Sequence, residues 1–417
     1  GGSSFAVSAA SVTLTADATT AGLDNPGSVL SVEENGAIAN GTDTNSVKAI
    51  VTDVNGNPVA GETVTFGATN SASVTASAIT GTDGSASAII TNLIAGTSEV
   101  TATVNGDSIT KDVNFVAGAL ADSNSTLSAN PTSIAADGVT TTTLSWKAAD
   151  ANDNPISGMT SVGFSVGAAT GVTIDSVTES SEGTYTAVLS GLKAQIITIS
   201  PTIDGTVTGT NTATVTLVPP LPVALPVSSR MGVNGTTFTT TQGFPSTGFA
   251  GATFQVQIEG NTANNSNYDW AVDRSWVSVD SSGNVTFSGE ASSTTKMVTI
   301  TATPKAGGVP YSYSFTLGNW FIFDSELLIK SDAISWCATL PGGYTLAPFH
   351  LATHGQFTRN IGSLWSEWGN AEAYNWPLDW GYWVDGGVLK DTYFPSIGSS
   401  QNTDDDRGLH TLCSRNL

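Results

Sequence analysis

The sequence predicts a mostly β protein, in which β-sandwiches in tandem precede a smaller α+β domain. Only 12% of the residues are charged, whereas Ser, Thr and Gly are abundant, a composition typical of strands joined by turns. Turn and strand motifs recur along the front of the chain, which is typical of repeated domains. The end of the chain differs, because seven of the ten tryptophans, both cysteines and all three histidines follow position 319. For a chain of 417 residues, three or four domains are expected.

The charge of the chain excludes some classes of partner. The formal net charge is −22, and residues 1–218 contain 4 lysines and 19 acidic residues, which gives 4 − 19 = −15. Because no basic patch is present, nucleic acid and anionic membranes are poor partners. No apolar run approaches the ~18 residues that a membrane span needs, and no signal peptide is recognisable. We therefore expect a soluble, monomeric, extracellular piece of a longer protein, whose export and anchoring segments lie upstream.

The first repeated unit covers residues 1–118. Residues 46–51 read as a strand, and residues 62–66 read as a second strand. Between them, residues 53–61 read D-V-N-G-N-P-V-A-G, in which Asn-Gly and Gly supply the positive φ angles of a tight turn. Further strands are predicted at residues 86–91, 99–104 and 113–116.

The second unit, residues 119–218, repeats this plan. Residues 150–158 match the earlier turn, and the two Asn-Pro pairs, Asn57-Pro58 and Asn154-Pro155, are 154 − 57 = 97 residues apart. Strands are predicted at residues 161–166, 183–189 and 215–218. Short strands repeated with a period of about 100 residues indicate tandem β-sandwiches.

These two units resemble the bacterial immunoglobulin-like repeats of the intimin and invasin family of outer-membrane adhesins. The most specific part of the resemblance is the D-x-N-G-N-P-V-x-G turn followed by T-V-T-F at residues 63–66. The second copy departs from it, because Asp153 replaces Gly, and Ile156 and Ser157 follow. The resemblance implies immunoglobulin-like β-sandwiches.

A proline-rich segment, residues 219–226, precedes a third sandwich at residues 227–318. Four prolines in eight positions favour polyproline II, so we expect a semi-rigid spacer. In the third unit, Trp276-Val277-Ser278-Val279-Asp280 and a following Gly-Asn-Val resemble another class of bacterial immunoglobulin-like domain. We expect Trp270 and Trp276 in its core rather than stacked on a sugar.

Residues 319–417 break the all-β pattern. Apolar residues recur at intervals of three and four over residues 325–340, which predicts an amphipathic helix that Ser325 caps and Pro341 ends. A second helix is predicted from about Gly355 to Gly369, with Phe357, Ile361, Leu364, Trp365 and Trp368 on one face. Strands are predicted at residues 380–384 and 408–414. Because almost no linker follows Leu317, we expect this head to pack on the third sandwich, with Trp320 buried at the junction.

Cys337 and Cys413 lie 76 residues apart. In an exported protein such a single pair is expected to be bridged, and in the chain-entropy model the closed loop contributes roughly 4 kcal/mol. A cysteine on the first helix, the Leu364–Asn370 segment, Trp383-Val384-Asp385-Gly386 and a cysteine on the last strand together resemble a C-type lectin-like domain over residues 320–417. Immunoglobulin-like sandwiches ending in such a tip resemble the ectodomain plan of the intimin and invasin family.

No metal, cofactor or catalytic site is expected. Lectins of this fold that bind sugar through calcium carry Glu-Pro-Asn or Gln-Pro-Asp and a later Trp-Asn-Asp, and neither occurs here. The three carboxylates of residues 404–406 point in different directions, so a solvated loop or a partner contact is favoured over a calcium site. His350 and His354 lack a third zinc ligand and the Glu of zinc proteases. No nucleophile elbow or phosphate-binding loop is present.

The candidate contact residues lie in the second half of the head. Trp365 and Trp368 are expected in the core, whereas an exposed tryptophan in the following stretch would be a binding hot spot. The candidate residues for partner binding are Trp376, Asp379, Trp380, Asp391, Asp404, Asp405, Asp406 and Arg407.

The resemblance implies the extracellular part of a bacterial surface adhesin, whose lectin-like tip binds a host protein while the sandwiches act as a stalk. An integrin, another glycoprotein and an immunoglobulin are all open as the receptor. The alternatives are an array of carbohydrate-binding modules, as in a larger secreted enzyme, or a purely structural stalk. Exposed coplanar tryptophans and binding that free sugar competes away would favour the carbohydrate alternative.

Overall fold

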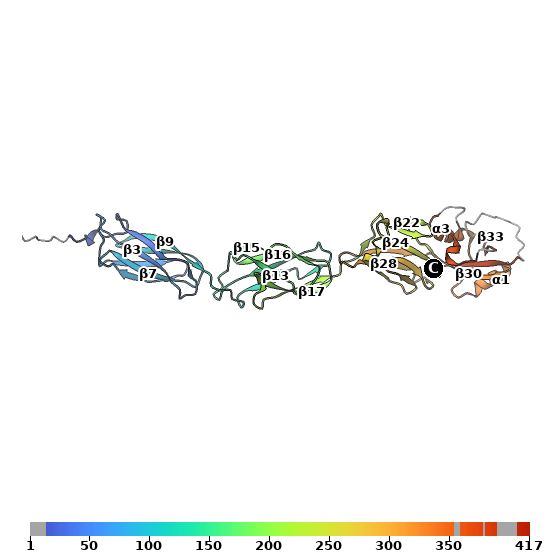
Figure 1. The fold of residues 1–417 in the computed structure, drawn as a ribbon, viewed down its shortest axis with the longest axis horizontal. Coiled ribbons are helices and arrows are strands. Elements are labelled where there is room, and N and C mark those ends of the chain that lie inside the picture. Colours follow the sequence, from blue (N-terminus) through green and yellow to red (C-terminus); the bar gives the residue numbers. More distant parts are fainter. Residues whose placement is uncertain (1–13, 354–358, 378–379, 390–406) are drawn as a thin grey trace, which may run out of the picture. The chain divides into compact units, whose positions relative to one another are not determined.

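The computed structural model describes residues 14–353, 359–377, 380–389 and 407–417 (Figure 1). The chain divides into two compact units. The first comprises Gly1–Ile134, Thr141–Leu189 and Ile196–Thr216, and the second comprises Ala135–Thr140, Ser190–Gln195 and Leu217–Leu417. The first holds two sandwiches, and the second holds the third sandwich with the head. The mostly β prediction is confirmed, because every described domain is built on β-sheets.

In the first sandwich, a four-stranded and a five-stranded sheet enclose a core of small and branched residues such as Leu30, Val47 and Val100, all 0% exposed. The four-stranded sheet has the order β1 (Val29–Glu34), β3 (Asn45–Ile50), β7 (Ser85–Thr91), β5 (Ser73–Val74). The five-stranded sheet has the order β2 (Ala37–Ile38), β9 (Asp107–Val116), β8 (Gly96–Val104), β4 (Thr63–Ala68), β6 (Ser77–Ile79). The strands predicted in this unit are therefore present. A 3₁₀ helix, η1 (Ala18–Thr20), precedes them.

The predicted turn between β3 and β4 is organised by the carboxylate of Asp53. Its Oδ1 accepts hydrogen bonds from the backbone N–H groups of Asn55 and Asn57, both at 2.9 Å, and its Oδ2 accepts one from Asp17 at 3.0 Å. These bonds, with that of Asp17 first, hold the pKa of Asp53 at about 2, below the ordinary 3.8. Gly56 has φ = 81°, which explains the glycine at this position.

The second sandwich repeats the turn with Asp150, which binds the N–H groups of Asn152 and Asn154. Asp153, which replaces the glycine, has φ = 65°, a conformation that Asp tolerates. One sheet has the order β10 (Thr126–Asn130), β12 (Thr142–Lys147), β16 (Thr184–Gly191), β14 (Val172–Ile174), with β15 (Thr178–Ser181) on β16. The other has the order β11 (Ser133–Ala135), β19 (Ala213–Val218), β17 (Gln195–Ile203), β13 (Val162–Ser165), with β18 (Thr206–Val207) on β17. Trp146, 1% exposed, fills the core beside Tyr185.

Part of the proline-rich segment, residues 219–226, joins the third sandwich. β20 (Val223–Ala224) pairs in parallel with β29 (Tyr311–Thr316), and Leu225 is buried. Its first sheet has the order β20, β29, β28 (Met297–Pro304), β25 (Tyr268–Val272). Its second has the order β22 (Thr236–Thr239), β21 (Arg230–Val233), β24 (Thr253–Gln257), β27 (Asn284–Phe287), β26 (Val277–Val279). Two 3₁₀ helices, η2 (Ile258–Gly260) and η3 (Asn265–Asn267), follow β24.

Trp276 lies in the third core, as predicted, with 7% of its surface exposed. Trp270 is half-buried, and its indole N–H donates to the carbonyl of Asn265 at 3.0 Å.

The head is built on one long strand, β30 (Asn319–Leu328), which the sequence patterns did not predict. Its sheet has the order β23 (Thr247–Gly248), β30, β34 (Leu409–Asn416), β32 (Tyr382–Val384), β33 (Gly387–Leu389), with β31 (Thr345–Leu346) on β34. β23 belongs in sequence to the third sandwich, so one sheet crosses the predicted boundary between the two domains.

Both predicted head helices are shorter than expected. The first, α1 (Lys330–Thr339), begins after Ile329, because Ser325 lies in β30 and does not cap the helix. Residues 355–358 lie outside the described part, and of the remaining prediction only α3 (Leu364–Trp368) is helical. Shorter helices, α2 (Phe349–Ala352) and the 3₁₀ helix η4 (Ala371–Tyr374), flank it.

Candidate binding surface of the head and its support

The predicted disulfide is present, and it joins the helix to the sheet of the head. Cys337 on α1 and Cys413 on β34 are bonded, with their Cα atoms 5.7 Å apart, and both are 0% exposed. Because β34 pairs with β30, β31 and β32, the disulfide links α1 to the centre of the sheet.

Aromatic side chains connect the head to the third sandwich in one continuous core. Trp368 of α3 is 1% exposed, and its ring lies 5.1 Å from that of Phe244 and 5.6 Å from that of Phe287, measured between centroids. The ring centroid of Trp320 of β30 likewise lies 5.8 Å from that of Trp276. The predictions that Trp320 is buried at the junction, and that Trp368 is a core residue, are therefore confirmed.

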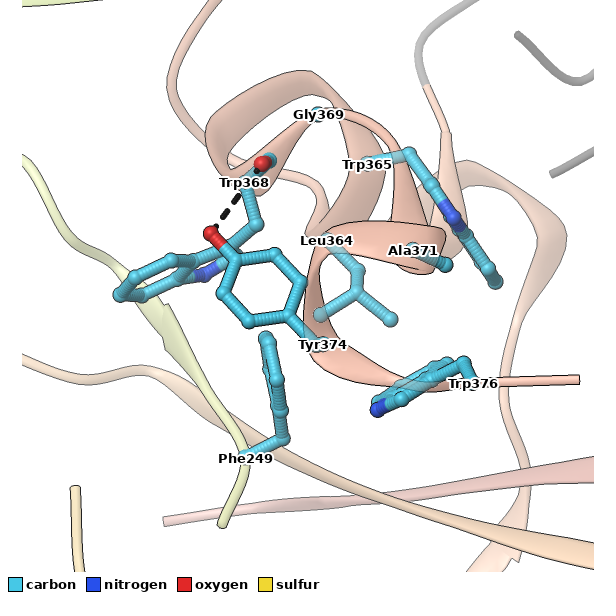
Figure 2. Close-up of a pocket in the computed structure, with 8 residues that line it drawn as sticks. All are labelled: Phe249, Leu364, Trp365, Trp368, Gly369, Ala371, Tyr374 and Trp376. Carbon is cyan, nitrogen blue, oxygen red and sulfur yellow. Dashed lines mark hydrogen bonds between the residues drawn. The ribbon is translucent and has the colours of Figure 1, made fainter. Parts of the chain in front are cut away.

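A small gap remains among these rings, where α3 and η4 meet the third sandwich (Figure 2). The side chains of Phe249, Leu364, Tyr374 and Trp376 point toward one another there, and the hydroxyl of Tyr374 donates to the carbonyl of Trp368 at 3.4 Å. The gap has room of about 10 Å³ for water, at the lower limit for one molecule, and its walls are apolar. We interpret it as a packing defect of the core, not as a ligand site.

The carboxylate of Glu367 joins α3 to the third sandwich by hydrogen bonds. Thr247 donates to it from its backbone N–H at 2.9 Å and from its hydroxyl at 2.6 Å, and Ser246 donates from its N–H at 3.1 Å and from its hydroxyl. Gly362 adds an N–H at 2.9 Å. Burial raises the pKa of Glu367, although the donors from Ser246, Thr247 and Gly362 act in the opposite direction.

Arg359 makes a second polar connection across the junction. Its guanidinium donates to the carbonyls of Val233 at 3.1 Å and Asn234 at 2.9 Å in the third sandwich, and to that of Glu367 at 2.9 Å in the head. The amide of Asn234 in turn donates to the carbonyl of Trp368 at 3.2 Å. A half-buried cation and a buried anion thus satisfy backbone groups of both domains, which fixes the head on the third sandwich.

On another part of the junction, Arg415 of β34 forms an ion pair with Glu290 of the third sandwich at 2.7 Å. Tyr344 donates its hydroxyl to the same carboxylate, and the Arg415 guanidinium lies 5.2 Å from the Tyr344 ring. A groove of about 240 Å³ opens beside Glu290. Its walls come from the third sandwich and from the head, and they are Phe249, Ala250, Glu290, Trp320, Phe321, Ile322, Phe323 and Trp376.

The predicted contact residues that the structure describes differ in whether they are buried or exposed. Trp376 is 5% exposed and packs on Phe249 and Phe323, so it belongs to the core and the prediction that it lies on the surface needs correction. Trp380 is 49% exposed. The structure describes all ten tryptophans, and each of the other nine is buried or half-buried. Arg407 is also exposed, just ahead of β34. Asp379, Asp391, Asp404, Asp405 and Asp406 lie outside the described residues.

Metal ligands do not cluster in the part of the chain that the structure describes, where no three His, Cys, Asp or Glu side chains are grouped to hold an ion. His350 lies on α2, and His354 lies outside the described residues. Within the same ranges, no helix is both long and apolar enough to cross a bilayer.

The sequence analysis missed Glu367, Arg359 and Asn234, the polar residues of the junction. A glutamate between two tryptophans on a short apolar segment was the available signal, because a carboxylate there must find donors or remain unpaired in the core. Nothing in the sequence indicated that the donors would be Ser246 and Thr247, which lie about 120 residues earlier.

Three tandem β-sandwiches, the last of them joined to an α+β head that is closed by a disulfide, define a class of modular, multidomain β proteins. Comparisons with known families identify its parts. Residues 27–116 match the bacterial Ig-like domain (group 1), residues 121–220 match invasin domain 3, and residues 229–315 match invasin domain 4.

Two relatives and one solved structure extend the comparison. The chain is 31% identical to the inverse autotransporter adhesin YeeJ of Escherichia coli (strain K12) over 86% of this chain and 15% of YeeJ. It is 29% identical to invasin of Yersinia enterocolitica over 85% of this chain and 42% of that invasin. A crystal structure of invasin, described as a bacterial integrin-binding protein, is 28% identical, with a TM-score of 0.49 over 97% of this chain and 81% of that one. The chain thus spans less than half the length of either relative.

The chain belongs to the intimin and invasin family of adhesins, as the resemblance in its turns and tip indicated. Members of this family lie at the outer surface of the bacterium, and this protein is accordingly a surface protein.

Proposed function

We propose that this segment mediates adhesion, with the lectin-like head binding a protein receptor on host cells and the sandwiches serving as a stalk. The observation that carries the proposal is Trp380, which is 49% exposed in a protein whose other tryptophans are mostly buried. A large exposed aromatic side chain is costly in solution and typical of binding hot spots. It lies on a domain that a disulfide and a shared core hold rigid, so little conformational entropy is lost when a partner binds.

The contact surface in this proposal includes Trp380 and Arg407, together with the acidic candidates Asp379, Asp391 and residues 404–406. Arginine and tryptophan are the side chains that most often dominate protein interfaces. The binding is non-covalent and needs no cofactor. The array of carbohydrate-binding modules receives less support, because a single exposed tryptophan cannot form a flat platform of coplanar rings.

The test is the binding of beads coated with the full chain to cultured epithelial cells. We expect Trp380→Ala to reduce binding at least tenfold, and Arg407→Ala to reduce it less. Leu221→Ala, which alters an 86% exposed side chain far from the head in sequence, is the matched control and should leave binding unchanged. Wild-type binding by Trp380→Ala would exclude the proposed surface.

The same assay, repeated with free sugars and with purified receptors, distinguishes the classes of receptor. Binding that survives mixed free sugars supports a protein receptor, whereas loss of binding would favour the carbohydrate alternative. The panel of purified proteins includes an integrin, which is the partner named for the solved invasin, and an immunoglobulin. Sensitivity to EDTA is expected with an integrin, because such a receptor carries its own metal ions.

A further inference from the structure

The groove of about 240 Å³ beside Glu290 follows the edge of a strand. Successive residues of a strand point to opposite faces of its sheet, and residues directly opposite on paired strands share a face. Ile322 lies opposite Cys413 and therefore faces α1, to which Cys413 is bonded. Phe323 points to the other face, where its ring centroid lies 4.5 Å from that of Trp376. Both residues line the groove, so the groove runs along the edge of β30, where the two faces meet.

This edge of β30 has no strand partner in the part of the chain that the structure describes. On one side, β34 pairs with β30 from Asn319 to Asp324. On the other side, β23 pairs only with Asn319 and Trp320. Because the N–H and C=O groups of successive residues alternate between the two edges of a strand, residues 321–324 direct about two donors and two acceptors toward the groove.

The open edge lacks the features that protect exposed strands against pairing. Residues 319–323 read N-W-F-I-F and contain neither Lys nor Pro, which commonly block an edge. The pairing of β30 with β34 is regular over these residues, and its register shifts only between Asp324 and Leu328. A regular, apolar edge with free backbone groups can accept one more strand.

Carboxylates lie at both ends of this edge. Glu290 lies at the Trp320 end, because its ion-pair partner Arg415 is opposite Trp320 on β34. Arg415 and Tyr344 both bind Oε1 of Glu290, so Oε2 has no hydrogen-bond partner among the described residues, and 41% of this side chain is exposed. At the other end, the half-buried Asp324 follows the apolar residues. The edge is thus suited to a partner with a positive charge on either side of an apolar stretch.

The walls of the groove are already in place before a partner binds. Phe249 and Trp376 are 3% and 5% exposed, and their ring centroids lie 5.0 Å apart. Trp320, which is 1% exposed, closes one end. Because these side chains are fixed by the core, little conformational entropy is lost in forming the site.

We propose that this groove binds an extended segment of another protein, which adds to β30 as a further strand. The backbone of the partner supplies the hydrogen bonds that the edge lacks, and its apolar side chains contact Phe249 and Ile322. A Lys or Arg at each end of the segment pairs with Glu290 and with Asp324. The site consists of other residues than the Trp380 surface, and it does not depend on the function proposed above.

The length of the edge defines the length of the segment. Residues 320–324 span about 14 Å at the usual rise of a strand, so about five residues of the partner lie in the groove. One residue more at each end brings its positive charge to a carboxylate. A peptide of alternating Val and Thr between two lysines, K-V-T-V-T-V-K, has these properties.

The test is the binding of this peptide, fluorescein-labelled and with blocked ends, to the full chain, measured by fluorescence anisotropy. We expect saturable binding with a Kd below about 1 mM. The same peptide with its central residues N-methylated should bind at least about tenfold more weakly, because its backbone donors are lost. E-V-T-V-T-V-E should also bind at least about tenfold more weakly, since its charges repel the carboxylates. Equal binding of the N-methylated peptide, or no binding of K-V-T-V-T-V-K, would overturn the proposal.

Two substitutions of exposed alanines locate the site. Ala250 is exposed on the wall of the groove, and Ala250→Trp places a large ring there. This variant should bind K-V-T-V-T-V-K at least about tenfold more weakly, because the ring occupies the place of the partner strand. Ala263→Trp introduces the same ring at an exposed position of the third sandwich that does not line the groove, and it should bind as the wild type does. Wild-type binding by Ala250→Trp would exclude this groove as the site.

Hydrogen exchange distinguishes strand addition from attachment by side chains alone. When the chain is saturated with K-V-T-V-T-V-K, the N–H groups of residues 321–324 that face the groove should exchange at least about tenfold more slowly, because they gain backbone partners. The first sandwich is the internal control and should exchange as before. Unchanged exchange of these residues at saturation would show that no strand is added, and the proposal would then be wrong.

Discussion

The first sandwich and the C-terminal unit are both built from β-sheets, but they are stabilised by different residues. The first sandwich contains neither Trp nor Tyr in residues 14–118, and its core consists of Ala, Val, Leu and Ile with Phe66 and Phe115. Its turns are held by carboxylates such as Asp53, which accept hydrogen bonds from nearby backbone N–H groups. The C-terminal unit places Trp276, Trp320 and Trp368 between two domains.

This difference teaches how a repeated domain differs from a pair of domains that share a core. A sandwich with its own aliphatic core can be repeated, because each copy is complete in itself. The third sandwich and the head share one core, one sheet and the buried Glu367, so neither is complete without the other. The third sandwich and the head therefore form a single packed body.

The substitution with the largest expected effect on stability is Trp368→Ala, which tests whether the third sandwich and the head share one core. Removing this buried ring should cost about 3–5 kcal/mol, because it leaves a cavity between the two domains. Hydrogen exchange should show the third sandwich and the head losing protection together, with the first sandwich unchanged. Trp146→Ala is the matched variant, and its effect should be confined to the second sandwich. Loss of protection in the head alone would contradict the shared core.

The second test removes the disulfide by Cys337→Ala with Cys413→Ala. The C-terminal unit should lose roughly 4 kcal/mol, because the 76-residue loop is no longer closed in the unfolded chain. Calorimetry with and without reductant measures the shift, and the first sandwich, which contains no cysteine, is the internal control. An unchanged melting temperature of the C-terminal unit would show that the cross-link contributes nothing.

The third test is Glu367→Gln, which should cost about 1–3 kcal/mol because an amide NH₂ group would face N–H donors of Ser246 and Thr247. Since burial raises the pKa of Glu367 above its ordinary 4.5, the folded state binds the proton more tightly than the unfolded state. The stability of the wild-type unit should therefore fall as pH rises from about 4.5 toward the folded pKa. Urea unfolding across that range should show this slope, and Glu367→Gln should abolish it. The exposed Glu326→Gln is the control.

The test with the smallest expected effect concerns Asp53 in the first sandwich. Its pH dependence of stability has the opposite sign to that expected from Glu367. The pKa of Asp53 is about 2 in the folded state and 3.8 ordinarily, so its stabilising contribution is present above pH 3.8. That contribution should be lost as pH falls from about 3.8 to 2. Hydrogen exchange of the first sandwich at several pH values should show this loss in the wild type and not in Asp53→Asn. The exposed Asp43→Asn should behave as the wild type.

The sandwiches could be predicted from local patterns because their strands and turns are encoded locally. The turn at residues 53–61 carries its own conformation, since Asp53 binds the N–H groups two and four residues later and Gly56 accepts a positive φ. Alternating residues of β3 and β7 likewise point in and out without reference to distant chain. The disulfide was predictable because only one pair of cysteines exists.

The head was predicted less well, because its elements are decided by distant partners. Ser325–Leu328 have helical spacing, yet they continue β30, since Leu328 pairs with Leu409 near the end of the chain. Val223–Ala224 read as a proline-rich spacer, yet they add to the edge of a sheet. Trp376 and Trp380 are similar in sequence context, and only packing against Phe249 and Phe323 separates the buried one from the exposed one.

The sequence by itself thus determined the β class, the repeat, the turns, the cysteine pair and the distinct tip, because each depends on residues close together or on composition. Only the tertiary structure decided that the third sandwich and the head are one body, and which tryptophan remains on the surface. The physical reason is that burial and hydrogen bonding of Glu367 and Trp368 depend on Ser246, Thr247 and Phe244, more than a hundred residues away, and no local pattern specifies such contacts.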